Sequence, residues 1–204
     1  HILDAAEKCF ARAGFHRTTM HDICHEASIS PGALYIYFAS KEALIVRIKE
    51  DIERGYAEAG KVFGRFPKAG CDVKAVEEFK EKDAPAAYYF PPSADGKRPG
   101  TYYVNGYDLP SRFLHALAPT TYHEAIPGHH FQIALEMELE FLPDLRKHAS
   151  HLAGNAYVEG WGLYSERLAD ELGLYRNEME RFGMLQGQAH RAARLVVDTG
   201  IHAF

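Results

Sequence analysis

The sequence predicts a mainly α-helical protein, in which a three-helix helix-turn-helix unit is followed by a helical metal-binding core with one short β-strand. Three observations lead to this prediction. Apolar residues recur at helical spacing through most of the chain, two Pro- and Gly-rich stretches at 64–70 and 84–100 interrupt that pattern, and histidines and glutamates gather at 120–132. We therefore expect two parts, residues 1–54 and residues 55–204.

Composition excludes several classes of protein. The 204 residues are 47% hydrophobic and 25% charged, as in ordinary globular chains, and the net charge of −5 suggests no polyanionic partner. No apolar run approaches the ~18 residues that a membrane-spanning helix needs, so no membrane association is expected. The three cysteines are far apart and no signal peptide is visible, which predicts free thiols and a cytoplasmic location.

The first part is predicted to form short helices in quick succession. A helix over residues 2–13 stops at Gly14. The next helices begin at residues that favour a helix start: Thr18 or Thr19, Ser30 followed by Pro31, and Lys41, which opens a longer helix to about Ala59. Three helices with a tight turn before the third are typical of a helix-turn-helix DNA reader, although a helical cap with no DNA role has the same pattern.

The second part combines loops, one strand and longer helices. Residues 64–70 and 84–100 are predicted loops, and Thr101–Asn105 is a short β-prone run before Gly106. Helices are predicted at 111–126, 129–141, 144–171 and 174–198, with breaks at Pro127-Gly128, Pro143 and Gly173.

The string HEAIPGHH, residues 123–130, predicts part of a metal site. Catalytic zinc usually takes three protein ligands, and a nearby carboxylate acts as the general base. His123 offers one ligand and Glu124 the base. On an unbroken helix His130 would share the face of His123, seven positions earlier. Pro127 breaks such a helix, and a bulge there could bring His129 onto that face instead, so spacing alone leaves both histidines open.

A third ligand is expected from the helix that follows. Asn155, Glu159, Glu166 and Asp170 fall on one helical stripe. We favour Glu159 as the ligand, with Glu166 as the alternate, and expect Asp170 to face water. Hydroxyl groups for oxyanion stabilisation could come from Tyr102, Tyr103, Tyr157 or Tyr164, among which Tyr103 enters the predicted site. Arg191 and Arg194 share a helix face and are either solvated or able to bind a substrate carboxylate.

The run AGFHRTTMHDICHEASISPGALYIYFASKEAL resembles the DNA-binding domain of the TetR family of bacterial repressors, and the likeness covers residues 2–48. The resemblance implies that Thr19 touches phosphate, that a recognition helix lies in the major groove and that the protein binds DNA as a homodimer. It places Ser30, Pro31, Gly32 and Tyr35 on or near the recognition helix and gives backbone contacts to Tyr37 and Lys41. The helical ligand-binding and dimerisation domain of that family is not recognisable in the rest of the chain.

Residues from about 56 to 204 resemble a bacterial family of unknown function, DUF885, which is grouped with zinc metallopeptidases of the gluzincin type. The matching segments are PPSADGKRPGTYYVNGYDLPSR, HEAIPGHHFQ, NAYVEGWGLYSERLADELGLY and RLVVDTGIHA. The resemblance implies Zn2+ on His123, His129 and Glu159, with Glu124 as the base. It also implies an edge strand at Thr101–Asn105 that pairs with a peptide substrate, and an oxyanion-stabilising role for His202.

Two functional hypotheses from different classes follow from the sequence. The first is a zinc-dependent peptidase that carries a TetR-like DNA-binding segment. The second is a TetR-type repressor whose second half is a helical scaffold without catalysis. A relic that binds metal without catalysis, or binds nothing, is a third hypothesis.

Overall fold

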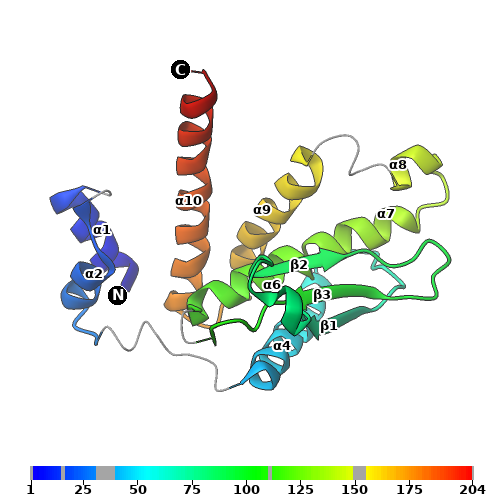
Figure 1. The fold of residues 1–204 in the computed structure, drawn as a ribbon, viewed down its shortest axis with the longest axis horizontal. Helices are drawn as coiled ribbons and strands as arrows, with labels where there is room; N and C mark the ends of the chain where they lie inside the picture. Colours follow the sequence, from blue (N-terminus) through cyan, green and yellow to red (C-terminus); the bar gives the residue numbers. More distant parts are fainter. Residues whose placement is uncertain (1, 15–16, 31–39, 110–111, 149–154, 204) are drawn as a thin grey trace.

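The computed structural model describes the chain except residues 1, 15–16, 31–39, 110–111, 149–154 and 204. It is mostly helical with a small sheet, so the predicted mainly-α class is confirmed (Figure 1). The main helices are α1 (Ile2–Ala13), α2 (Met20–Glu26), α4 (Lys41–Ala59), α6 (Leu117–Glu124), α9 (Ala156–Glu171) and α10 (Glu178–Ala203). Shorter elements are α5 (Glu78–Glu81), a 3-10 turn (Leu114–Ala116), a π-helical turn (His130–Ala134), α7 (Leu135–Met137) and α8 (Asp144–His148).

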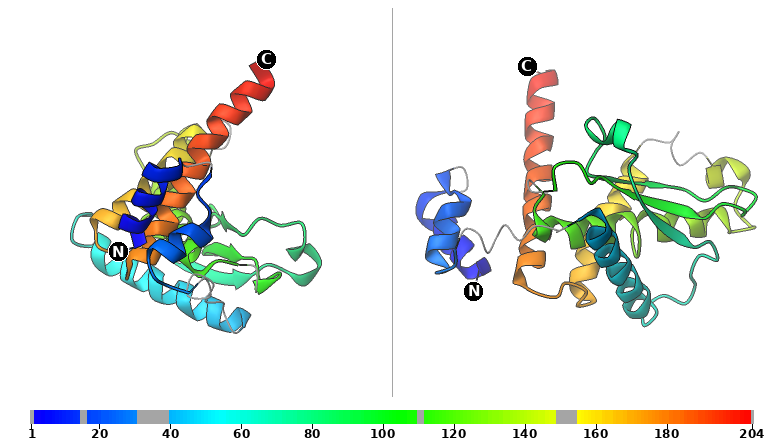
Figure 2. Two further views of the ribbon diagram at one scale, coloured as in Figure 1. Left: turned by 90° about the vertical axis from the view of Figure 1, so that its left-hand side faces the viewer. Right: turned by 60° about the horizontal axis from the view of Figure 1, so that its bottom comes forward.

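Helices α1 and α2 form a small packed pair beside the N-terminal half of α10 (Figures 1 and 2). Thr19 caps α2, because its hydroxyl accepts from the Asp22 N–H while the Asp22 carboxylate accepts from the Thr19 N–H. A buried cluster joins the pair to α10; its members are Ala5, Ala6, Cys9, Ile23, Ala27 and Phe182. The predicted third helix falls at residues 31–39, outside the described residues.

Helix α4 runs through the predicted boundary between residues 54 and 55. Its buried Leu44, Ile48 and Ile52 pack against the sheet and against α6. At Gly55 the approach is so close that an added Cβ would lie 2.7 Å from the carbonyl oxygen of Ile126. Residues 41–59 therefore pack with the second part of the chain.

The sheet has the order β1-β3-β2, formed by Cys71–Ala75, Gly100–Val104 and Ala87–Phe90. Strand β3 corresponds to the predicted strand, but β2 lies in a stretch predicted as loop, and β1 was not predicted. Both are short and gain their pairing from β3, with Tyr88 stacked on Tyr103 across β2 and β3 at 5.0 Å between ring centroids. Because β3 is paired on both sides, the expectation that it is an edge strand is wrong.

The predicted helix breaks are confirmed, whereas the helix lengths differ. No described helix continues through Pro127-Gly128, Pro143 or Gly173. The helix predicted at 111–126 starts only at Leu117, and that predicted at 144–171 is represented by α8 and α9. Among the described residues, no helix is both long enough and apolar enough to cross a membrane.

Candidate metal centre

The chain turns back between α6 and the π-helical turn, and this turn brings two histidines together. His123 lies in the last turn of α6, and the helix ends at Glu124. A Cβ on Gly128 would collide with the carbonyl oxygen of His123, so only glycine fits where the chain folds back. His129 immediately precedes the π-helical turn, and its ring lies 4.6 Å from that of His123, centroid to centroid.

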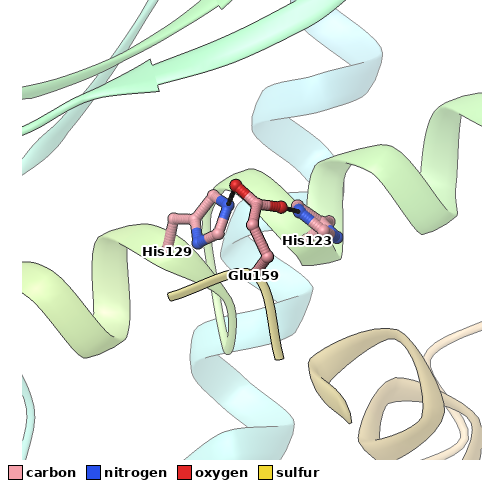
Figure 3. Close-up of side chains that lie close together, drawn as sticks. All are labelled: His123, His129 and Glu159. Atoms are coloured by element: carbon pink, nitrogen blue, oxygen red, sulfur yellow. Dashed lines mark ion pairs between the residues drawn. The ribbon is translucent and has the colours of Figure 1, made fainter. Parts of the chain in front are cut away.

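Glu159 in the first turn of α9 faces both rings (Figure 3). Its Oε2 lies 3.4 Å from His123 Nε2 and its Oε1 lies 3.7 Å from His129 Nε2. One ligand atom from each of the three side chains lies within 4.8 Å of the other two. Both imidazoles are buried while the Glu159 side chain is 55% exposed, so the cluster is enclosed by protein on one side and open on the other.

His130 does not join this cluster. Its Nδ1 is 2.8 Å from the Tyr89 hydroxyl and its Nε2 is 3.1 Å from the Ala69 carbonyl oxygen. Both ring nitrogens are thus used to tie the π-helical turn to β2 and to the loop before β1. Spacing on an unbroken helix would have put His130 beside His123, but the helix is broken at Pro127-Gly128.

Glu166, the alternate ligand, lies behind His123. Its Oε1 is 2.8 Å from His123 Nδ1, and its side chain is 1% exposed. With Nδ1 held there, His123 presents Nε2 to Glu159. A carboxylate that bonds the second nitrogen of a histidine fixes both the tautomer and the direction of the ring.

Packing of α6 against α9 makes these contacts possible. A Cβ on Gly162 would lie 2.6 Å from the His123 ring, whereas one on Gly160 would meet nothing within 4 Å. The close approach between the two helices is therefore at Gly162.

The electrostatics of the cluster favour a positive charge between His123 and Glu159. Burial lowers the pKa of His123, but the carboxylates of Glu159, Glu166 and Glu124 outweigh it and raise that pKa to about 9. Burial and the charge of His123 lower the pKa of His129 to about 4. An environment that stabilises a proton on one imidazole and leaves the other neutral also suits a bound cation.

Glu124, the predicted base, is half-buried at the end of α6. Burial raises its pKa to about 7; the charge of His123 acts against this rise and that of Glu159 adds to it. A carboxylate with this pKa can both accept and release a proton near neutral pH.

Two predicted catalytic residues lie elsewhere. Tyr103 points to the opposite face of β3 from the buried Tyr102, because side chains alternate along a strand, and it stacks on Tyr88. The side chain of His202 is 74% exposed near the end of α10, where its Nδ1 lies 2.8 Å from the Asp198 carbonyl oxygen. Among the described residues, neither side chain has a hydrogen bond or ion pair to His123, His129 or Glu159, and their oxyanion role stays a prediction.

Comparison with known proteins identifies the family. The model of a family described as "Bacterial protein of unknown function (DUF885)" matches residues 1–204. The chain belongs to this family. A crystal structure described as "the putative lipoprotein from Colwellia psychrerythraea" is 35% identical, with a TM-score of 0.80, over 98% of this chain and 34% of that chain. The DUF885 chain thus spans about a third of the length of this solved relative.

Part of the DUF885 chain is also similar to transcriptional regulators. The HTH-type transcriptional regulator UidR of Escherichia coli K12 is 51% identical over 57 residues, which are 28% of this chain and 29% of UidR. The HTH-type transcriptional repressor KstR2 of Rhodococcus jostii is 35% identical over 80 residues, which are 38% of this chain and 36% of KstR2.

The predicted DNA contacts of the DUF885 chain are only partly within the described residues. Thr19 is exposed at the start of α2, and Ser30 is exposed as well. Lys41 Nζ lies 2.7 Å from Oε1 of the buried Glu81, so its ammonium group is used to hold α4 against α5. Pro31, Gly32, Tyr35 and Tyr37 lie outside the described residues.

Two contacts around the candidate metal centre of the DUF885 chain were not predicted from the sequence. Tyr89 was in a predicted loop, and nothing nearby in sequence connects it to His130. Arg191 was assigned to solvent or to substrate, but it donates to Glu166 from α10. Its position three residues before Arg194 indicated only that the two arginines share a helix face.

Proposed function

We propose that the chain forms the metal-binding part of a zinc-dependent hydrolase that cleaves peptide or related amide bonds. His123, His129 and Glu159 would hold the zinc. The observation that carries this proposal is the convergence of two imidazole Nε2 atoms on one carboxylate, at 3.4 and 3.7 Å. Ligands about 2.0–2.2 Å from a tetrahedral zinc are separated by roughly 3.3–3.6 Å. The two contacts use different oxygens of Glu159 and are close to this spacing, and one ligand atom from each of the three side chains lies within 4.8 Å of the other two, which supports binding of one ion after the side chains draw together.

The chemistry of the donors also fits zinc. Two imidazoles and one carboxylate suit zinc better than magnesium or calcium, which prefer oxygen ligands alone. The buried Nδ1 of His129 has no hydrogen-bond partner among the described residues, so no competing contact holds its ring away from the cluster. When bound, zinc would supply Lewis acidity toward a water molecule and a substrate carbonyl group.

The residues around the cluster have separable roles in this proposal. Glu124 takes a proton from the attacking water and passes it to the leaving amine. Glu166 keeps His123 Nε2 pointed at the site. An extended peptide would pair with β2, which is an edge strand of the described sheet and packs against α6, the helix that carries His123.

Zinc content and one variant test the proposal. Purified protein loaded with zinc and dialysed should retain about one equivalent, and less than about a tenth of an equivalent would reject the zinc site. Glu124→Gln should retain the zinc and lower peptide hydrolysis by about 10²–10⁴-fold. Glu140→Gln, an exposed carboxylate, is the matched control and should leave hydrolysis unchanged. Full hydrolysis by Glu124→Gln would remove Glu124 from its role.

We also propose that the N-terminal part binds DNA, with two copies of the chain on one site. The similarity to UidR and KstR2 supports this second function. Binding to duplex DNA should strengthen as salt is lowered, because contacts to phosphate dominate the affinity. Tyr35→Ala should weaken it. A protein that binds no duplex even at low salt would contradict the proposal.

A further inference from the structure

Arg191 of α10 donates two hydrogen bonds to the carboxylate of Glu166, which itself bonds His123. Its Nη2 donates to Glu166 Oε1 at 2.7 Å, and its Nη1 donates to Glu166 Oε2 at 3.1 Å. The same Oε1 also bonds His123 Nδ1 at 2.8 Å. A chain of contacts thus runs from α10 through α9 to the imidazole on α6.

Glu166 is buried, so its carboxylate depends on the pairing with Arg191 for charge balance. A carboxylate that is 1% exposed needs its charge balanced within the protein. Within the described part of the chain, Arg191 is the only lysine or arginine whose side-chain nitrogen lies within 4.0 Å of Glu166. A guanidinium fork holds both oxygens of a carboxylate in one plane, which a single ammonium cannot do.

We propose that Arg191 is a positioning residue of the metal centre. It fixes the Glu166 carboxylate, and Glu166 in turn keeps His123 Nε2 directed at Glu159 and the metal. This inference rests on the proposed zinc site. It replaces the sequence-based alternative in which Arg191 binds a substrate carboxylate, because both of its Nη atoms already serve Glu166.

Zinc affinity, measured by competition with a chromogenic chelator, tests the proposal without relying on activity. Arg191→Met removes the fork and keeps an aliphatic stem, and it should weaken zinc binding about 10–100-fold, as loss of an outer-shell partner does. Arg191→Lys keeps the charge without the fork and should give a smaller loss. Arg194→Met is the matched control, an exposed arginine one turn along α10, and should bind zinc as the wild type does.

A double variant separates positioning from a general effect on folding. In a Glu166→Gln background, Arg191→Met should cause little further loss of zinc affinity, because Arg191 acts through Glu166. Thermal unfolding of each variant without zinc identifies any that fail to fold; if Arg191→Met fails, Arg191→Lys decides.

Three results would contradict the role of Arg191 or the zinc site itself. Zinc affinity within twofold of wild type in folded Arg191→Met, or in Arg191→Lys where Arg191→Met does not fold, overturns the positioning role alone. An undiminished effect in the Glu166→Gln background also overturns it, because Arg191 would then act by another route. Failure of the wild type to bind zinc removes the proposed function, and the role of Arg191 with it.

Discussion

Helices α1 and α2 are held by residues close together in sequence, whereas the candidate metal centre joins residues far apart in it. Cys9 and Ile23 pack across two adjacent helices, and Phe182 is the one distant member of their cluster. By contrast, His123 depends on Glu166, 43 residues later, and on Glu159 between them. A segment of the first kind can resemble regulators over 57 residues by itself. A site of the second kind exists only when three helices pack correctly.

The largest expected effect concerns the two adjacent histidines. His129→Ala should weaken zinc binding by more than about 100-fold, since even the loss of an outer-shell partner costs 10–100-fold. His130→Gln should change zinc affinity only a few-fold, because His130 bonds Tyr89 and Ala69 instead of the cluster. Calorimetric titration with zinc measures both. Equal losses in the two variants would contradict the arrangement of the centre.

The next effect tests the packing between α6 and α9. Gly162→Ala should lower zinc affinity about tenfold or more and destabilise the fold by about 1–3 kcal/mol, because the new methyl group meets the His123 ring. Gly160→Ala is the matched control; it has free space and should gain up to ~1 kcal/mol from helix propensity. Urea unfolding and zinc titration give both quantities, and two indistinguishable variants would refute the close approach.

A smaller effect should separate the two regions energetically. Phe182→Leu should destabilise the packing of α1 and α2 on α10 by about 1–1.5 kcal/mol and leave zinc affinity unchanged. Amide hydrogen exchange in α1 and α2 reports the first effect and zinc titration the second. Leu185→Ala, at a nearby and more exposed position, should destabilise this packing by a smaller amount. A coupled loss of zinc binding in Phe182→Leu would show that the regions are not independent.

The smallest effect is at the start of α2. Thr19→Ala removes the capping box and should cost about 1 kcal/mol. Thr199→Ala is a suitable control, because that hydroxyl bonds to carbonyl groups of its own helix. Thermal unfolding monitored by circular dichroism compares the stability of the two variants. Equal stability would show that the Thr19 cap does not stabilise α2.

The sequence by itself determined the helical class, a helix cap at Thr18 or Thr19, of which the structure shows Thr19, and the breaks at Pro127-Gly128 and Gly173. It could do so because caps and helix breaks act within about one turn of backbone. It also supplied the residue types of the candidate centre, since His123, Glu124, the histidine pair and Glu159 were all named.

Only the tertiary structure decided how those residues meet. The fold-back at Gly128 directs His129 rather than His130 toward His123, and the packing at Gly162 brings Glu159 and Glu166 to the two nitrogens of His123. The local sequence pattern likewise did not predict strands β1 and β2 or the contact of Arg191 with Glu166. Each arises from pairing or packing between segments tens of residues apart, and such contacts leave no periodic signal in either segment alone.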